Sequence, residues 1–149
     1  MSIFDLIGQD GIVISTAQQL SVEDALDTCC EKLIATNKVT PGYCQAIKRT
    51  HSEIGPYYVL APKIAMPHAR PEDGVNEAAL QVTVFKNGID FGSEENGDAY
   101  LAITLAAKDS ESHIQTIMAL SELFQNDEDV EAIIKAESIE SIIEILKKY

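Results

Sequence analysis

The hydrophobic positions along the chain follow two different periods, and the first is helical. From Ser21 to residue 36, apolar side chains recur every three or four positions behind a Ser-Val-Glu-Asp start, which is typical of a capped amphipathic helix. A second helix is expected to begin at Thr40-Pro41 and to end before Gly55-Pro56, because proline suits a first helical turn and a Gly-Pro pair stops one. The first third of the chain therefore predicts two helices.

After residue 56 the pattern changes to short runs rich in β-branched and aromatic residues. Four such runs predict strands, namely Tyr57–Leu60, Lys63–Met66, Leu80–Phe85 and Tyr100–Ala106. The turn dipeptides Asn87-Gly88 and Asn96-Gly97 flank Ile89-Asp90-Phe91, which predicts a β-hairpin inserted before the last and longest of these strands.

The helical period returns beyond Lys108. Three apolar stripes predict three packed helices, over residues 114–124, 130–134 and 139–146. Helices before and after a block of nearly continuous apolar strands favour an α/β sandwich with helices on both faces. We therefore expect one domain over residues 1–149, built on a mixed sheet of about five strands.

Composition and charge narrow the class of partner. The chain has 149 residues, 46% of them hydrophobic and 23% charged, which is typical of a globular domain. Its 11 basic and 24 acidic residues give a net charge of −13, and residues 90–149 carry 4 basic and 14 acidic residues. Such a surface repels phosphate backbones and anionic lipids, so nucleic acid and membrane surfaces are not expected partners. No apolar run reaches the length of a membrane span and no basic leader opens the chain, which predicts a cytoplasmic protein without membrane insertion.

The cysteines and known local motifs point to neither a disulfide nor a cofactor. Cys29, Cys30 and Cys44 are an odd set without metal-ligand spacing, so we expect reduced thiols in the core. The three histidines show no metal-binding pattern, and the glycine-rich motifs of nucleotide-binding folds are absent. We therefore expect no metal and no cofactor.

The segment from residue 61 to residue 74 carries the first candidate chemistry. It holds three of the five prolines, Pro62, Pro67 and Pro71, and presents His68 directly after the second of them. Proline restricts the backbone, so His68 would sit on a rigid turn where a neutral imidazole can act as a nucleophile. Arg70 could clamp the oxygens of an incoming phosphoryl group. The alternative from spacing alone is a surface histidine beside a surface arginine.

Two further positions are candidates. His113 follows Ser110-Glu-Ser, a plausible helix start, where the helix dipole and free N–H groups favour an anion such as phosphate. The alternative is a helix histidine without a role. Lys48, Arg49 and His51 lie near the end of the second helix, where cationic side chains complement the dipole, and Arg49 is also a candidate phosphate ligand.

Two stretches resemble one family. The run Leu60-Ala-Pro-Lys-Ile-Ala-Met-Pro-His-Ala69, preceded by Glu53, resembles the active-site signature of the enzyme IIA (EIIA) components of the bacterial phosphoenolpyruvate-dependent sugar phosphotransferase system, mannitol/fructose class. Ser112-His-Ile-Gln-Thr-Ile-Met118 resembles the second histidine region of that family, and the resemblance covers nearly the whole chain. Residues 55–62, followed by Pro-His-Ala-Arg-Pro-Glu72, look closest to the ascorbate branch.

The resemblance implies an activity and partners. It implies that His68, through Nε2, accepts a phosphoryl group from the phosphocarrier protein HPr and passes it to a cysteine of an EIIB component. EIIB in turn serves the membrane component EIIC, which binds the carbohydrate. The resemblance also implies that His113 contacts the phosphoryl oxygens, and Arg49 is the nearest match to an arginine that supports the phosphate in mannitol-type members.

A phosphocarrier needs a surface that two partners can recognise, and we expect an apolar ring around His68 that includes Ile64, Met66 and Ala69. Three alternatives stay open. The chain could be a regulatory EIIA-like phosphoprotein, an EIIA for mannitol, fructose or galactitol, or a non-catalytic interaction module in which Pro67-His68 is only a rigid turn.

Overall fold

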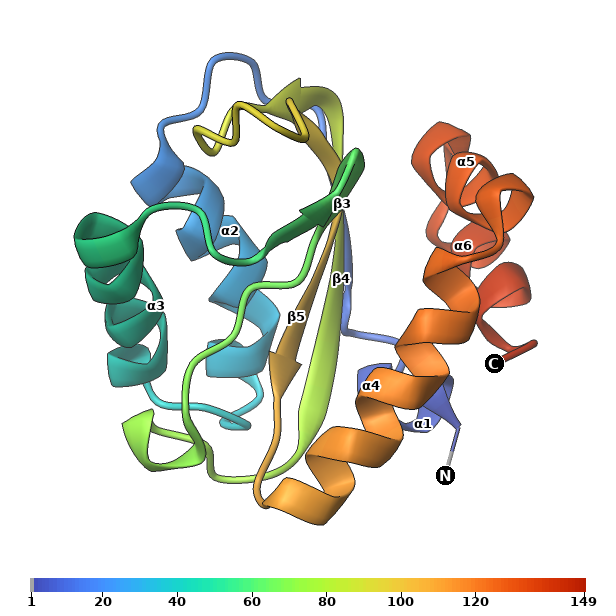
Figure 1. Ribbon diagram of the computed structural model, residues 1–149. Helices are drawn as coiled ribbons and strands as arrows, with labels where there is room; N and C mark the ends of the chain where they lie inside the picture. Colours follow the sequence, from blue (N-terminus) through green and yellow to red (C-terminus); the bar gives the residue numbers. More distant parts are fainter. Residues whose placement is uncertain (1) are drawn as a thin grey trace.

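A five-stranded mixed sheet forms the middle layer of the computed structural model, which describes residues 2–149 (Figure 1). The strands are β1 (Ile12–Ser15), β2 (Val59–Ala61), β3 (Lys63–Ala65), β4 (Ala79–Ile89) and β5 (Ala99–Ala106). Their order across the sheet is β1-β4-β5-β3-β2. The β1–β4 and β3–β5 pairs are parallel, whereas β4–β5 and β2–β3 are antiparallel.

Helices cover both faces of this sheet. On one face lie α2 (Val22–Ala35) and α3 (Pro41–Ile54), and on the other lie α1 (Ile3–Ile7), α4 (Ser110–Phe124), α5 (Asp127–Lys135) and α6 (Ile139–Leu146) (Figure 1). A short 3-10 helix spans Pro71–Asp73. The predicted α/β sandwich, with about five strands in a mixed sheet, is confirmed.

The central strands separate two cores because successive side chains point to opposite faces. Leu80, Val82 and Val84 of β4 pack with α1, α4, α5 and α6, while Ala79 and Phe85 pack with α2 and α3. Both faces are buried, which explains why the strands read as continuous apolar runs.

Three details differ from the sequence-based expectation. The longest strand is β4, with 11 residues, and it runs through Asn87-Gly88 instead of ending there in an inserted hairpin. The pairing with β5 shifts register between Val84 and Ile89, and Gly88 has φ +74° with Tyr100 2.8 Å from where a Cβ would stand. Asn87-Gly88 therefore marks a bulge against an aromatic ring. The third difference is that α1 and β1 were not predicted, because elements of five and four residues leave too short a pattern.

One polar side chain ties β4 to α2 inside the core. Gln81 is fully buried, and its amide accepts from Lys32 N–H at 2.8 Å and donates to the Thr28 carbonyl at 2.7 Å. In a regular helix these two backbone groups would pair with each other, so the amide bridges one position of the helical hydrogen-bond ladder.

We expect Gln81→Leu to lower the free energy of unfolding by about 1–3 kcal/mol, because two partly buried backbone groups lose a hydrogen-bond partner. Thr104, directly opposite Gln81 on β5, provides the matched control. Its hydroxyl oxygen is buried and has no hydrogen-bond partner among the described residues, so Thr104→Val should leave stability unchanged or slightly raised. Urea unfolding of both variants measures the difference, and equal stabilities would contradict the bridging role of Gln81.

Candidate functional site

A cleft of about 840 Å³ opens between the end of α3, the segment after β3 and the start of α4. Its lining residues come from both helical layers and from the proline-rich turn, and they are Arg49, Thr50, Glu53, Ile54, Tyr57, His68, Ala69, Arg70, Pro71, Asp73, Asp109, Ser110, His113 and Ile114. Five residues predicted from the sequence to belong to the site therefore meet around one space, although they are spread over 65 positions of the chain, from 49 to 113.

His68 lies three residues beyond the end of β3, directly after Pro67, and hydrogen bonds hold both its imidazole and the adjoining backbone. Its Nδ1 lies 2.8 Å from the carbonyl oxygen of Met66. A carbonyl only accepts, so Nδ1 carries the proton, and in the neutral ring Nε2 keeps the free lone pair. The backbone is anchored as well, since Leu105 N–H donates to the Pro67 carbonyl at 3.0 Å. This arrangement suits a nucleophile that reacts through Nε2.

Tyr57 contacts His68 on a second side. Its hydroxyl donates to the His68 carbonyl, and the two rings meet edge to face with centroids 5.4 Å apart at 77°. Burial raises the pKa of Tyr57 to about 12, so the phenol stays protonated and remains a donor. Tyr57 was predicted only as a strand residue. The Gly55-Pro56 helix stop was the available signal, because it turns the chain back towards β3.

His113 lies in the first turn of α4, as predicted. The capping residue is Asp109, whose carboxylate accepts from Ser112 N–H at 2.8 Å, and this hydrogen bond holds the pKa of Asp109 below its usual range. The backbone N–H of His113 donates to the Asp109 carbonyl at 3.1 Å. Because that N–H is occupied, the imidazole is the group of His113 that can serve a phosphate in the cleft.

Arg49 and Arg70 bring two guanidinium groups to the cleft lining, where Glu53, Asp73 and Asp109 also lie. Among the residues that the structure describes, neither arginine forms an ion pair with a carboxylate. Both guanidinium groups are exposed, so they can turn towards an anion that enters the cleft.

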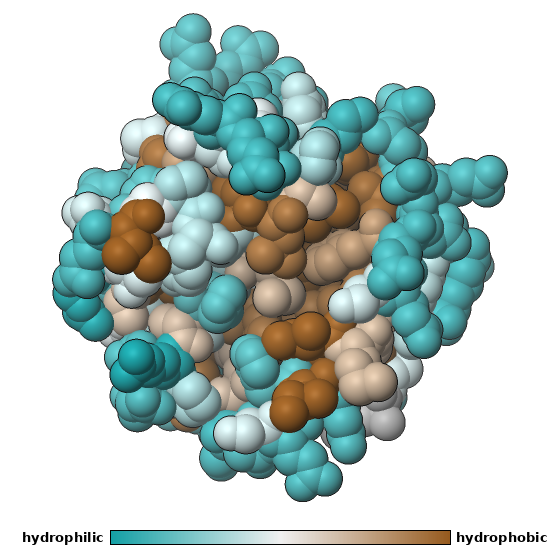
Figure 2. All heavy atoms as spheres, in the orientation of Figure 1, coloured by the Kyte–Doolittle hydropathy of each residue, from teal (hydrophilic) through white to brown (hydrophobic). Residues whose placement is uncertain are grey.

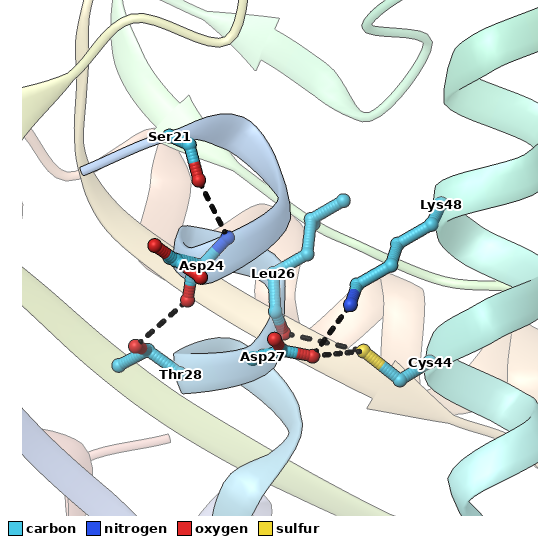
Figure 3. A network of polar contacts seen from close by, with 7 residues as sticks. All are labelled: Ser21, Asp24, Leu26, Asp27, Thr28, Cys44 and Lys48. Atoms are coloured by element: carbon cyan, nitrogen blue, oxygen red, sulfur yellow. Dashed lines mark hydrogen bonds and ion pairs between the residues drawn. The ribbon is translucent and has the colours of Figure 1, made fainter.

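Lys48 and His51, the neighbours of Arg49 on α3, have other partners. Lys48 Nζ lies 2.7 Å from a carboxylate oxygen of Asp27 on α2, and the Cys44 thiol lies beside the same carboxylate (Figure 3). His51 Nδ1 lies 2.8 Å from the hydroxyl of Tyr58, and burial lowers the pKa of His51. His51 lies in the last turn of α3 as expected, and both residues also have specific side-chain partners.

The cysteines are core residues, as predicted. Cys29, Cys30 and Cys44 are free thiols and all three are buried. Burial raises the pKa of the Cys29 thiol well above its usual range, which keeps it protonated and unreactive. No three His, Cys, Asp or Glu side chains within residues 2–149 are placed to hold a metal ion.

The apolar surface beside His68 differs from the predicted one. Ile64 and Met66 are only 5% and 6% exposed, because both side chains pack into the core shared with α4, and they form no surface ring. Ala69 does line the cleft. The exposed apolar side chains there are Ile54 on α3 and Ile114 on α4, at 69% and 59% exposure. Figure 2 shows hydrophobic side chains gathered in a hollow on this face, between the two helical layers, with hydrophilic side chains around it.

Comparisons with known proteins show the family to which the sequence and fold are similar. Residues 6–149 match the family model described as phosphoenolpyruvate-dependent sugar phosphotransferase system, EIIA 2. The mannitol-specific cryptic phosphotransferase enzyme IIA component of Escherichia coli (strain K12) is 39% identical over 127 residues, 85% of each chain. A solution structure of the mannitol-specific cryptic enzyme IIA from Escherichia coli has a TM-score of 0.88 at 35% identity and covers both chains fully.

Two further relatives bear on substrate and partner. The ascorbate-specific EIIA component of Shigella flexneri is 30% identical over 149 residues, covering 99% of this chain and 97% of that one. A structure of the complex of enzyme IIAMTL and phosphorylated enzyme IIBMTL from Escherichia coli matches with a TM-score of 0.81 at 26% identity, covering 95% and 97% of the two chains. No helix within residues 2–149 has the length and hydrophobicity that crossing a membrane requires.

Proposed function

Because the chain belongs to the EIIA type-2 family of the phosphoenolpyruvate-dependent sugar phosphotransferase system, we propose that it carries a phosphoryl group on Nε2 of His68 between HPr and an EIIB component. The observation that carries this proposal is the hydrogen bond between His68 Nδ1 and the Met66 carbonyl, 2.8 Å long. It leaves the Nε2 lone pair free on the ring that lines the cleft.

The proposed transfer consists of two successive displacements at phosphorus. In the first, the Nε2 lone pair of His68 forms a bond to phosphorus while the N–P bond of the donor phosphohistidine breaks and its electrons return to the donor imidazole. In the second, a cysteine thiolate of EIIB forms an S–P bond while the His68 N–P bond breaks. The proton of His68 stays on Nδ1 throughout, hydrogen-bonded to the Met66 carbonyl, so Nε2 is the only ring atom whose covalent bonding changes.

The remaining polar side chains of the cleft stabilise charge. The transferred phosphoryl group passes through a loose transition state with its charge spread over three equatorial oxygens. His113 supplies an imidazole N–H, and Arg49 and Arg70 supply guanidinium groups from two other parts of the cleft wall. Donors that bind this developing charge more tightly in the transition state than in the ground state lower the barrier to transfer.

The exposed apolar side chains at the cleft suit transient partners. Ile54 on α3 and Ile114 on α4 belong to opposite helical layers, and both line the cleft that contains His68. Ala69 adds a small apolar contact. We propose that HPr and EIIB use this same surface in turn, because each must bring its reacting atom to Nε2. The structural similarity of this chain to enzyme IIAMTL, which was solved in a complex with phosphorylated enzyme IIBMTL, supports EIIB as one of the two partners.

The test is the intact mass of the protein after incubation with phosphoenolpyruvate, enzyme I and HPr. We expect an acid-labile gain of one phosphoryl group per chain. If HPr becomes phosphorylated and this chain gains nothing, the phosphocarrier proposal fails and the interaction-module alternative takes its place. If the chain is phosphorylated and transfers to no EIIB, the regulatory alternative is supported.

We propose L-ascorbate as the carbohydrate served, since residues 55–62 look closest to the ascorbate branch. Mannitol is the second candidate, because identity over the matched residues is higher with the mannitol-specific cryptic component, 39% against 30%. Offering the phosphorylated protein an EIIB of each system decides between them. The faster acceptor identifies the branch, and equal rates would exclude discrimination at this step.

The acidic surface predicts a dependence on salt. With a net charge of −13, the protein attracts a partner whose docking surface is positive, and the attraction speeds their encounter. We expect the second-order rate of phosphoryl transfer from HPr to fall about tenfold as ionic strength rises from about 0.02 M to about 0.5 M, because screening shortens the reach of the charges. Quenched time courses at several salt concentrations measure this transfer rate, with sucrose as a control for viscosity. A rate independent of salt would exclude electrostatic steering.

A further inference from the structure

Two tyrosine hydroxyls hold the peptide group that follows His68. The carbonyl of that peptide, on His68, accepts from the hydroxyl of Tyr57. The N–H of the same peptide, on Ala69, donates to the hydroxyl oxygen of Tyr43 at 3.0 Å. Tyr43 then donates its own proton to the Leu105 carbonyl at 2.6 Å, which links the peptide to β5. Both polar groups of one peptide are thus fixed by side chains from outside its own segment.

The two tyrosines come from separate positions around α3 and differ in burial. Tyr43 lies in the first turn of α3 and is fully buried, whereas Tyr57 follows the helix and is half-buried in the cleft wall. Burial raises the pKa of both phenols above the usual range, so each hydroxyl keeps its proton across the neutral pH range. Both hydroxyls can therefore donate a hydrogen bond throughout the neutral pH range.

The same contacts reach the imidazole of His68. Its ring rests against the ring of Tyr57, and its Nδ1 is bonded to the Met66 carbonyl. The peptide after His68, the ring face and one ring nitrogen are therefore each restrained, and Nε2 is the atom of the ring left for reaction. Restraints of this kind matter because misplacing a reacting group by about 1 Å can lower a rate about 100-fold.

We propose that Tyr43 and Tyr57 are positioning residues for His68: their hydroxyls clamp the His68–Ala69 peptide, and the ring of Tyr57 sets the imidazole so that Nε2 faces the incoming phosphoryl group. This inference rests on the proposed function of His68. It adds two residues that were not predicted from the sequence as site residues.

Tyr57→Phe is the sharpest test, since it removes one hydroxyl and keeps the ring. Tyr58→Phe is its matched control. Tyr58 is buried and contacts the ring of Tyr57, but its hydroxyl is hydrogen-bonded to His51 and not to the His68 peptide. Single-turnover transfer from phosphorylated HPr is measured over a range of donor concentrations. We expect Tyr57→Phe to lower the limiting rate about tenfold and to leave the half-saturating donor concentration unchanged, while Tyr58→Phe changes neither.

A second readout follows His68 directly. Nitrogen-15 NMR of the imidazole should show the Nδ1-protonated tautomer in the parent and in Tyr58→Phe. In Tyr57→Phe the His68 carbonyl loses its restraint, so the imidazole can leave the Met66 carbonyl that holds the tautomer, and we expect a mixture of tautomers. Unchanged rate and unchanged tautomer in Tyr57→Phe would overturn the proposal. So would equal losses in both variants, which would indicate general destabilisation.

Failure of the clamp is distinguishable from failure of the phosphocarrier proposal. If the parent protein itself gains no phosphoryl group, the proposed function fails, and the tautomer of His68 still decides whether the clamp exists. Tyr43→Phe extends the test to the N–H end of the peptide, with thermal unfolding measured beside it. A Tyr43→Phe protein that folds and transfers at the parent rate would restrict the clamp to Tyr57 and overturn the paired role.

Discussion

Replacing His68 with alanine is expected to abolish phosphorylation by HPr, with no mass gain under conditions in which the parent protein is fully converted. Alanine removes Nε2, the atom that we propose forms the bond to phosphorus, and we expect no other cleft residue to replace it. His113 is the other imidazole there, and it lies in the first turn of α4, on the opposite side of the cleft lining from α3. Loss of the bond-forming atom predicts complete loss of transfer and not a slower rate.

The control for this result is His51→Gln. His51 is also half-buried and is a sequence neighbour of cleft residues on α3, but it does not line the cleft itself. Its Nδ1 is hydrogen-bonded to the hydroxyl of Tyr58. We expect this variant to gain one phosphoryl group as the parent does. Circular dichroism of each variant checks that the fold is kept. A phosphorylated His68→Ala protein would show that another residue is the carrier.

The sequence predicts helix boundaries and candidate site residues well where the determining residues are neighbours in the chain. Helix α2 begins where Ser21 places it, and α3 begins at Pro41 and ends before Gly55, because caps, proline and glycine act on their immediate neighbours. His68 became a candidate because Pro67 beside it restricts the backbone, and His113 because adjacent residues place it at a helix start. The resemblance of residues 60–69 and 112–118 to the EIIA family then favoured these two histidines over the alternative of histidines without a role.

The sequence was insufficient where burial is decided by distant contacts. Ile64 and Met66 are next to His68 in the chain and looked like surface contacts, yet the strand pattern turns both side chains into the core. Ile54 and Ile114 form the exposed apolar surface instead, and they are brought to His68 only by the packing of two helices on opposite faces of the sheet. Local patterns carry no information on that packing.

Tyrosine 43 shows the same limit for a positioning residue. Its hydroxyl bonds to Ala69, 26 positions later, and to Leu105, 62 positions later, so its role depends on α3 lying over the end of β5. Spacing along the chain predicts its place on the buried stripe of α3 and nothing about the His68 peptide. The candidate site is therefore assembled where the sheet and the two helical layers meet, with His68 beyond the end of β3 and the other lining residues from α3, α4 and the connecting segments.

The second large effect is expected from His113→Ala, which should slow phosphoryl transfer about 100-fold to 1000-fold without abolishing it, as the loss of one preorganised donor to a charged transition state does elsewhere. The variant keeps Nε2 of His68, so the intact mass at long times should still show one phosphoryl group. Rapid-quench measurement of the transfer rate from phosphorylated HPr gives the size of the effect.

The control for His113 is Gln115→Ala on the same helix, because Gln115 is exposed and does not line the cleft, and we expect the parent rate. His113→Gln returns an N–H donor of similar length without a titrating ring, so it should recover part of the rate if hydrogen bonding to the phosphoryl oxygens is the role of His113. A His113→Ala protein with the parent rate would remove this residue from the site and leave Arg49 and Arg70 as the groups that balance the charge. Since those two guanidinium groups have no carboxylate partner in the part of the chain that the structure describes, they are free to do so, and the residual rate of His113→Ala measures how much they contribute.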